Sequence, residues 1–236
     1  MDFFINTKHR TDKEELMDDF SIGGELLRDT LDKLENINRW LGGNRVTVKA
    51  LERILKDHPK EKELRIVDVG CGHGDILRDV AKFGRKHQYK MTLVGVDANP
   101  TAIEYANELS KDFPELSFVT QDIFSEEFSK RPYDVLLATL FFHHFKEDAL
   151  VSFLEKSLRS ATIGIVVNDL HRNKMAYYLF LFLSIFISNK MIIEDGLTSV
   201  LRGFKRNDLE RISQKLNIKS NIKWKWAFRF QWILQK

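Results

Sequence analysis

The chain has 236 residues, 43% of them apolar, which is enough for one large α/β domain with a substantial core. Its 37 basic and 34 acidic side chains give a net charge of +3, so the overall charge does not indicate a polyanionic partner. The single cysteine, Cys71, excludes an intrachain disulfide and favours a reducing compartment. The first ten residues lack a signal-peptide pattern, and the longest uncharged stretch, 175–189, is shorter than the ~18 residues of a spanning helix. We therefore expect a soluble, cytoplasmic protein.

The predicted elements alternate between helix and strand for most of the chain. Two amphipathic helices come first, one at 24–41 that Gly42-Gly43 ends and one that closes before Pro59. The elements expected next are strands at 64–69, 91–96, 116–120, 135–138 and 163–167, with helices at 76–83, 100–109 and 146–159. An aromatic insert at 174–196, a helix near 207–216 and two short antiparallel strands within 222–234 follow. This order predicts an α/β fold with a doubly wound parallel sheet covered on both faces.

The stretch IVDVGCGHGD, residues 66–75, places three glycines at alternate positions directly after the first buried strand. Such glycines let the backbone turn sharply and approach a ligand, and the helix that opens near Asp75 presents free N–H groups to it. In a parallel sheet, ligands bind beyond the carboxyl ends of the strands. A dinucleotide site would want glycine at position 75 and an apolar residue at 68, where this chain has Asp75 and Asp68. Asp68 suits a ligand that carries an ammonium or sulfonium group.

The pattern Asp-x-Gly-x-Gly-x-Gly resembles the first motif of class I S-adenosylmethionine (SAM) dependent methyltransferases. The resemblance covers about residues 60–236 and extends to Leu140–Phe145 and Asn168–Arg172, which are similar to segments of small-molecule methyltransferases from quinone and polyketide biosynthesis. It implies a Rossmann-like seven-stranded sheet with an antiparallel last strand. We accordingly expect an N-terminal helical lid at 1–58 and a methyltransferase core at 59–236 that carries the aromatic insert.

The same resemblance implies that SAM binds across the ends of the first four core strands. Asp97 ends the second strand and is expected to accept both ribose hydroxyls. Asp122 would accept from the adenine amino group while Ile123 packs on the ring; a helix cap is the alternative for either acid. The expected cofactor-binding residues are Asp68, Gly70, Cys71, Gly72, Asp75, Asp97, Ala98, Asp122, Ile123 and Thr139.

Three histidines at predicted strand ends, His143, His144 and His171, are candidate catalytic bases. Methyl transfer from a sulfonium needs alignment and exclusion of water, and a phenol or enol acceptor also needs a base in the range where imidazole titrates. We favour His144 and His171; the alternative for each is a packing or helix-entry role. With Asp169 they also suggest a metal site, but adjacent histidines point apart and no HExxH-like spacing is present, so we expect no metal. His73, inside the glycine loop, is expected to shape the cofactor pocket.

The aromatic insert lies where this fold grows its acceptor-binding cover. Most of its side chains read as those of a core helix, but as a cover they predict an apolar, aromatic or lipid-like small-molecule acceptor. Phe182 and Phe186 share a helix face and Phe180 lies about 200° away, so one face should pack on the sheet while the other lines the acceptor pocket or meets a membrane. The expected acceptor-binding residues are Asn38, Arg39, Tyr178 and Phe182.

Three other functions are weighed against this interpretation. Residues 172–236 carry 13 Lys/Arg against 4 Asp/Glu, and KWKWAFR at 223–229 suits an RNA-stacking surface, although alternating Lys and Trp also describes a half-buried edge strand. Thr139–Phe142 stands where base-amino methyltransferases have an Asn/Asp-Pro-Pro-aromatic motif, and we expect no DNA partner.

Basic residues beside an aromatic helix suit a peripheral membrane contact, which is compatible with a lipid-soluble acceptor. A nicotinamide oxidoreductase ranks last because of Asp68 and Asp75. The sequence defines neither the acceptor nor the oligomeric state.

Overall fold

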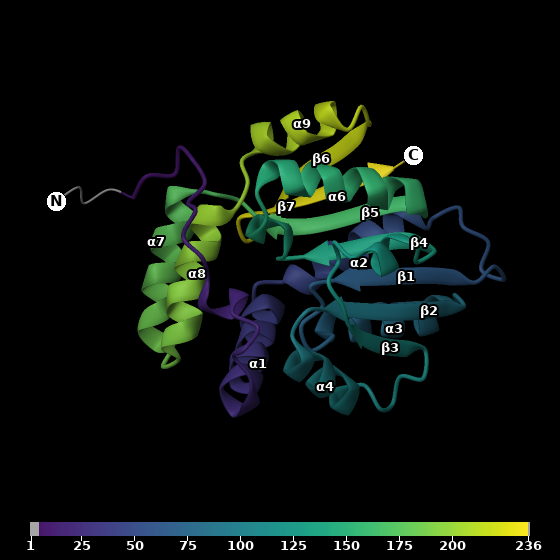
Figure 1. Ribbon diagram of the computed structural model, residues 1–236, viewed down its shortest axis with the longest axis horizontal. Coiled ribbons are helices and arrows are strands. Elements are labelled where there is room, and N and C mark those ends of the chain that lie inside the picture. The colour runs from purple at the N-terminus through teal and green to yellow at the C-terminus, as the bar shows by residue number, and fades with distance from the viewer. Residues whose placement is uncertain (1–4, 236) are drawn as a thin grey trace.

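The computed structural model describes residues 5–235, so the first four residues of the expected lid and the last residue of the expected core lie outside the described residues. Within that range the chain forms one seven-stranded sheet with the strand order β3-β2-β1-β4-β5-β7-β6 (Figure 1). The strands are β1 (Leu64–Val69), β2 (Met91–Asp97), β3 (Leu116–Thr120), β4 (Tyr133–Thr139), β5 (Ala161–Leu170), β6 (Ser220–Lys225) and β7 (Arg229–Gln235). β1 to β5 are parallel, and β7 runs antiparallel between β5 and β6. The predicted Rossmann-like sheet with an antiparallel last strand is confirmed.

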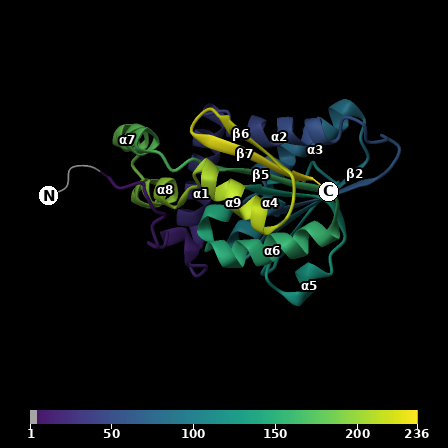
Figure 2. The ribbon, with the colours of Figure 1, turned by 90° about the horizontal axis from the view of Figure 1, so that it is seen from above.

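Helices cover both faces of this sheet. They are α1 (Gly24–Trp40), α2 (Gly43–Ile54), α3 (Asp75–His87), α4 (Pro100–Leu109), α5 (Glu126–Ser129), α6 (Glu147–Ser160), α7 (Lys174–Leu183), α8 (Lys190–Arg202) and α9 (Arg206–Lys215). α2 and α3 lie on one face and α6 and α9 on the other (Figure 2). α4 begins as its sequence predicts, because the Asn99 side chain accepts the N–H of Thr101 and Pro100 occupies the first turn.

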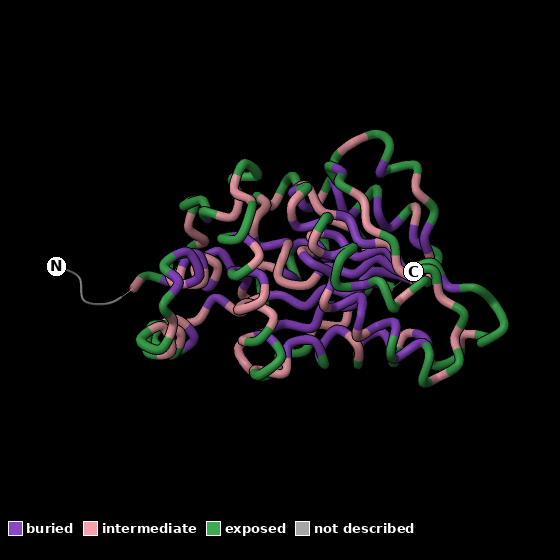
Figure 3. The backbone as a smooth tube through the Cα atoms, turned by 90° about the horizontal axis from the view of Figure 1, so that it is seen from below, coloured by how far each residue is buried: buried purple, intermediate pink, exposed green. Residues whose placement is uncertain are grey.

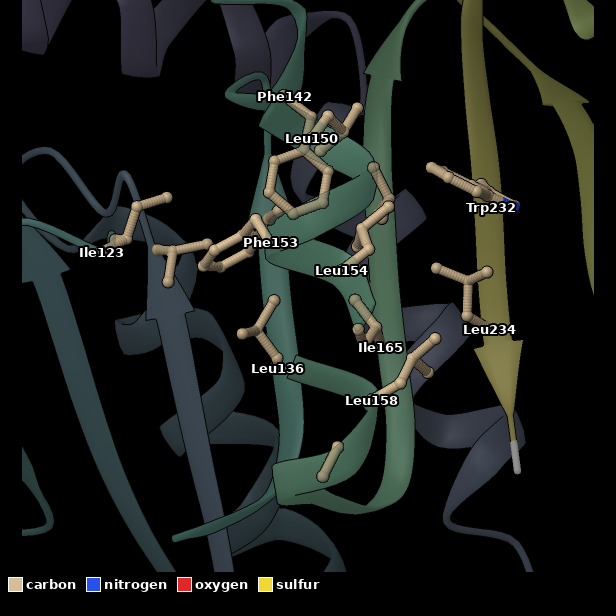
Figure 4. Close-up of a cluster of buried hydrophobic side chains, with 14 of the residues drawn as sticks. Ile123, Leu136, Phe142, Leu150, Phe153, Leu154, Leu158, Ile165, Trp232 and Leu234 are labelled. Carbon is tan, nitrogen blue, oxygen red and sulfur yellow. The ribbon is translucent and has the colours of Figure 1, made fainter. Parts of the chain in front are cut away.

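The core fixes the strand ends on which the site depends. Burial follows the strands through the middle of the molecule (Figure 3). On the α6 face, Leu136 of β4 and Trp232 of β7 are fully buried in one cluster with Phe153 and Leu154 of α6 (Figure 4). Each large apolar side chain buried in this way contributes roughly 1.5–3 kcal/mol. The sheet is therefore a rigid base for the loops at its carboxyl edge.

A cover lies beyond the carboxyl ends of the parallel strands, where α1, α7 and α8 stand together (Figure 1). Of the two N-terminal helices, α1 belongs to this cover, whereas α2 packs on the sheet and buries Ala50 and Leu51 completely. No helix within residues 5–235 is long and apolar enough to cross a membrane.

The aromatic insert is divided into α7, a short 3-10 helix at Ser184–Phe186, and α8. Its interpretation as a core helix is wrong for α7, in which Ala176 is the one buried residue. The expected packing on the sheet is also wrong: Phe180 packs on α8, where a Cβ at Gly196 would come within 2.2 Å of its ring. Phe182 and Phe186 do share the other face, with ring centroids 6.0 Å apart. α7 packs on α8 and not on the sheet. Most of the apolar side chains of α7 therefore stay exposed.

Candidate active site

The glycine loop joins β1 to α3 at the centre of the carboxyl edge. Gly70, Gly72 and Gly74 all have positive φ, at 65°, 51° and 79°, which side chains rarely tolerate. At Gly70 a Cβ would also lie 2.1 Å from the Phe141 ring. The backbone N–H groups of Gly70 and Cys71 donate to the Val96 carbonyl, which ties the loop to β2. The loop thus presents bare backbone to the space above the sheet, as its sequence predicts.

Asp97, at the end of β2, holds this loop in place. Its Oδ2 accepts from Gly72 N at 2.9 Å and its Oδ1 from Asn99 N at 2.9 Å. Burial raises the pKa of the Asp97 carboxyl, although the backbone N–H groups act in the opposite direction. Each carboxylate oxygen keeps a lone pair that these two bonds do not use, so both remain able to accept from a ligand.

Two further acids, the buried Asp68 and the partly buried Asp75, lie beside the loop. Asp68 is 1% exposed and its Oδ1 has no hydrogen-bond partner, and burial next to Asp75 and Asp97 raises its pKa well above the ordinary value. Burial also raises the pKa of Asp75, whose Oδ2 accepts from Asn44 at 3.0 Å. Three neighbouring carboxyl groups, one of them unpartnered, suit a cationic ligand and oppose a pyrophosphate.

The other expected cofactor residues are divided between the cavity and its surroundings. Cys71 and Thr139 line the cavity, and burial raises the pKa of the Cys71 thiol well above its ordinary value, so it is no ready nucleophile. Ala98 follows Asp97 without lining the cavity, Asp122 is exposed and accepts the N–H of Phe124, and Ile123 is buried in the α6-side core.

His143 lies between two buried carboxylates. Its Nδ1 is 2.7 Å from Asp169 Oδ1, and its Nε2 is 3.6 Å from Glu15 Oε1. Burial alone would lower the pKa of His143, but Asp169 and Glu15 outweigh it and raise the pKa to about 9. At neutral pH this imidazole is protonated and cannot accept a proton from an acceptor.

His144 has a different environment because its ring lies in the cavity wall. Its Nδ1 is 2.7 Å from Asp18 Oδ1 and its side chain is 20% exposed. Burial favours the protonated form of Asp18, but hydrogen bonds from His144 and Arg202 outweigh it, and the Asp18 pKa lies well below its usual range. Since an ionised carboxylate only accepts, Nδ1 of His144 carries the hydrogen and a neutral His144 has its lone pair on Nε2.

His171 also lines the cavity. Its hydrogen-bond partner, Trp224, comes 53 residues later in the chain. Its Nδ1 accepts the Trp224 indole N–H at 3.3 Å, so the neutral ring carries its own hydrogen on Nε2. Burial and the charges of Lys205 and Arg172 lower the pKa of His171. The two favoured histidines therefore face the cavity with opposite tautomers, one with a free lone pair and one with a donor.

Glu15, His143 and His144 could in principle hold a metal, because their ligand atoms lie within 4.8 Å of one another. Contacts of Arg202 and Ser199 with the carboxylates compete with metal binding. Arg202 Nη1 is 3.7 Å from Glu15 Oε1 and 2.5 Å from Asp18 Oδ2, and Ser199 donates to Glu15 at 2.6 Å. The carboxylates are thus already compensated by the guanidinium and the charged His143.

One large cavity, of about 1280 Å³, joins the glycine loop to these histidines. Its wall includes Asp68 and Asp97 at one end, and Leu179, Phe180 and Phe182 at the other. The predicted roof from the insert is thus present above the strand ends. A cavity of this size, with an acidic end and an aromatic end, can hold two molecules side by side.

The expected acceptor residues differ in position. Asn38 lines the cavity and is buried, with its Nδ2 2.5 Å from Asn44 Oδ1, and Phe182 lines it while remaining 60% exposed. Arg39 is exposed and pairs with Glu35 at 2.5 Å and Asp79 at 3.1 Å. Tyr178 lies outside the cavity wall, and its hydroxyl accepts the N–H of Ile5.

A family model for a methyltransferase domain matches residues 60–177, half of the chain. The chain belongs to this methyltransferase family. None of the curated proteins compared with it matches in sequence. The prediction of a class I, SAM-dependent methyltransferase is confirmed at the level of family and fold.

Solved structures similar to this methyltransferase agree in fold. The plantazolicin methyltransferase BpumL in complex with S-adenosylhomocysteine (SAH) is 18% identical, covers 90% of this chain and 89% of its own, and has a TM-score of 0.65. The magnesium protoporphyrin IX methyltransferase of Synechocystis PCC 6803 with bound SAH is 14% identical, covers 82% and 84%, and has a TM-score of 0.55. The CurJ carbon methyltransferase is 14% identical, with a TM-score of 0.61.

Sequence reasoning missed several residues of the methyltransferase site. Glu15, Asp18 and Glu35 come from the first forty residues, and Arg202 from the end of α8. Glu35 contacts His73 Nε2 at 3.1 Å and so holds the glycine-loop histidine in place. The acidic run at 14–19 was the available signal, but nothing in it shows which strand end it approaches.

Proposed function

We propose that this methyltransferase transfers the methyl group of SAM to an apolar small molecule, with His144 as the general base. The observation that carries the proposal is the single cavity that connects the glycine loop and Asp97 with His144 and with the aromatic side chains of α7. Methyl transfer needs a cofactor and an acceptor held side by side away from water, and this cavity has room and distinct walls for both.

The residues present fit SAM. The positive-φ glycines expose backbone, Asp97 keeps two acceptor oxygens, and the unpartnered Oδ1 of buried Asp68 suits a positively charged group. Gly70, Gly72, Asp68 and Asp97 would hold the cofactor, which supplies an electrophilic methyl group on a sulfonium. Two structural neighbours were crystallised with SAH, which supports the same cofactor here.

The base assignment follows from the hydrogen bonds of the three histidines. His144 has its lone pair on Nε2 because Asp18 takes the Nδ1 hydrogen, whereas His143 is already protonated and His171 presents a donor. Nε2 of His144 accepts the proton of a hydroxyl or enol acceptor, and Asp18 stabilises the imidazolium that forms. His171 would orient the acceptor oxygen through its N–H.

The wall of the cavity indicates what the acceptor is like. Leu179, Phe180 and Phe182 from the insert and Leu27 and Leu31 from α1 give it an apolar surface. We therefore propose an apolar acceptor of aromatic or lipid-like character, methylated on oxygen or carbon.

The test is calorimetry with SAH, followed by a screen with methyl-labelled SAM against cell extracts fractionated by polarity. We expect SAH to bind the wild-type protein and the label to enter apolar fractions. A protein that is folded but binds neither SAM nor SAH would contradict the proposal. Label found only in RNA would show that the acceptor is RNA and not an apolar small molecule.

A contact with a membrane surface has one specific observation in its favour. Phe182, Ile185 and Phe186 are 60%, 73% and 75% exposed at the far end of the cover, and Lys174 and Lys190 flank this apolar segment with no acidic residue between them. Such a segment suits the interface of an anionic bilayer and would place the cavity roof near a lipid-soluble acceptor.

The alternative of RNA methylation depends on Trp224 and Trp226, which are 47% and 64% exposed. Trp224, however, donates to His171, and Trp226 lines the cavity. These contacts favour a role in the acceptor pocket over a surface for stacking bases.

A further inference from the structure

Arg229, the first residue of β7, is buried, and two of its three guanidinium nitrogens have no hydrogen-bond partner among residues 5–235. It pairs in register with Leu170 of β5, is 3% exposed, and lines the cavity. Its Nε and Nη1 are buried and have no hydrogen-bond partner among the described residues. Burial lowers the pKa of Arg229 to about 10, against the opposing effect of Asp169, so the group stays charged at neutral pH.

The other buried arginines of this protein each have hydrogen-bond partners for their guanidinium groups. Arg78 bonds to the His73 carbonyl and to Glu35, Arg172 to the Thr7 carbonyl and Asp208, and Arg202 to Asp18 and the His144 carbonyl. The one carboxylate that acts on Arg229, Asp169, is already bonded to His143 and to Leu170 N. A buried charge left unpaired costs several kcal/mol, so Arg229 weakens the fold unless a ligand pairs with it.

Arg229 packs closely against Gly43 and also lines the cavity. A Cβ at Gly43 would lie 2.9 Å from Arg229 Cζ and 1.8 Å from Asn38 Oδ1, so a glycine is needed at this position for the guanidinium and the amide to lie there. The cavity that Arg229 lines also reaches His171 and Phe228. A guanidinium fork matches the two oxygens of a carboxylate and binds them bidentately.

We propose that Arg229 is an anion-binding residue of the cavity and that its ligand is a carboxylate. The inference rests on the proposed function, because a methyltransferase cavity has two sources of that group: the amino-acid end of the cofactor, and an acidic substituent on an otherwise apolar acceptor. Arg229 would thus fix the orientation of the molecule that carries the carboxylate.

The experiment compares wild type, Arg229→Met and Arg229→Lys, with Arg45→Met on the exposed side of α2 as the matched control. Calorimetry measures SAH against 5′-methylthioadenosine, which lacks the amino-acid end, and then 2-naphthoate against neutral 2-naphthamide on SAH-saturated protein. If the cofactor supplies the carboxylate, Arg229→Met loses at least about tenfold in SAH affinity and keeps its affinity for 5′-methylthioadenosine. If the acceptor supplies it, SAH affinity is unchanged and the preference for naphthoate over naphthamide disappears. Arg229→Lys keeps a charge without the fork and should retain part of the preference.

Without ligand, Arg229→Met should be at least as thermally stable as wild type, because it removes an unpaired buried charge. A clear loss of stability would show that Arg229 is structural and overturn the inference. The inference is also overturned if wild type shows no preference for the carboxylate member of either ligand pair, a result that needs no folded variant. Failure of SAH and 5′-methylthioadenosine alike to bind wild type would instead contradict the proposed function.

Discussion

The two ends of the cavity are built in different ways. At the cofactor end, the backbone N–H groups of the glycine loop donate to β2: Gly70 and Cys71 to the Val96 carbonyl, and Gly72 to the Asp97 carboxylate. At the acceptor end, His144 contacts Asp18, which lies 126 positions earlier in the chain, and Arg202, from α8, bonds to both. Side chains rather than backbone make most of these contacts.

This difference separates a geometry that depends mainly on the backbone from one that depends on individual side chains. Two backbone hydrogen bonds and the Asp97 carboxylate fix the glycine loop, so that end can serve one cofactor. Ion pairs and apolar packing between α1, α7 and α8 depend on individual side chains, and these can change with the acceptor without disturbing the sheet. The following experiments would break or sharpen that distinction.

The largest effect is expected for His144→Asn, which keeps a donor toward Asp18 and removes the Nε2 lone pair. With an acceptor from the labelling screen, kcat should fall by roughly 10²–10⁴-fold while SAH affinity stays within about twofold. Asp18→Asn should give a smaller loss in kcat, because the tautomer of His144 is no longer fixed. Equal activity in wild type and His144→Asn would remove the base assignment.

The next prediction concerns stability and pH. The pKa of His143 rises from an ordinary 6.5 to about 9 in the fold, so its ion pairs contribute stability fully below about pH 6.5 and lose it as the pH rises through 9. We expect the free energy of unfolding to fall by on the order of 3 kcal/mol across that window, measured by urea denaturation. His143→Gln should flatten the profile; an identical slope in that variant would assign the pH dependence to another group.

At the cofactor end, Asp97→Ala should weaken SAH binding by roughly 2–3 kcal/mol, through two missing charge-assisted hydrogen bonds and a loosened Gly72. Calorimetry measures the loss and circular dichroism checks the fold. Asp122→Ala is the informative companion, because Asp122 is exposed and outside the cavity wall. A comparable loss in that variant would show that the adenine site extends beyond the cavity.

The smallest effect on stability is expected for Phe186→Ser, since this ring is 75% exposed. The free energy of unfolding should change by no more than about 0.5 kcal/mol. Co-sedimentation with vesicles of phosphatidylcholine and phosphatidylglycerol should nevertheless decrease, whereas Leu109→Ser, an exposed apolar position on α4, should not affect it. If the wild-type protein does not co-sediment with these vesicles, the proposed membrane contact is wrong.

The fold and the cofactor end could be predicted because their signals are local. The glycines of residues 70–74 and the Asn-Pro cap of α4 act on structure within a few residues of themselves, and the acid that ends β2 is recognisable from its place at the end of a predicted strand. Strand periodicity and the alternation with helices then determine a sheet whose carboxyl ends meet.

The acceptor end could be predicted only in part, for a physical reason. His143, His144 and His171 were visible as strand-end residues, but which of them has a free lone pair depends on Asp169, Asp18 and Trp224, which no periodicity connects to them. Arg229 reads as one more basic residue in a basic terminal segment, and its burial becomes apparent only when β7 is placed between β5 and β6.

That placement has a consequence for how the chain is made. The residues of β7 are synthesised after those of β5 and β6, yet they fill the position between these two strands in the sheet. Until they emerge, β5 has an open edge and the partners of Trp232 in the α6-side core are uncovered. Nascent chains of this protein are therefore exposed to edge-to-edge association until residues 229–235 have emerged, and a chain released before residue 229 lacks the strand that seals its core.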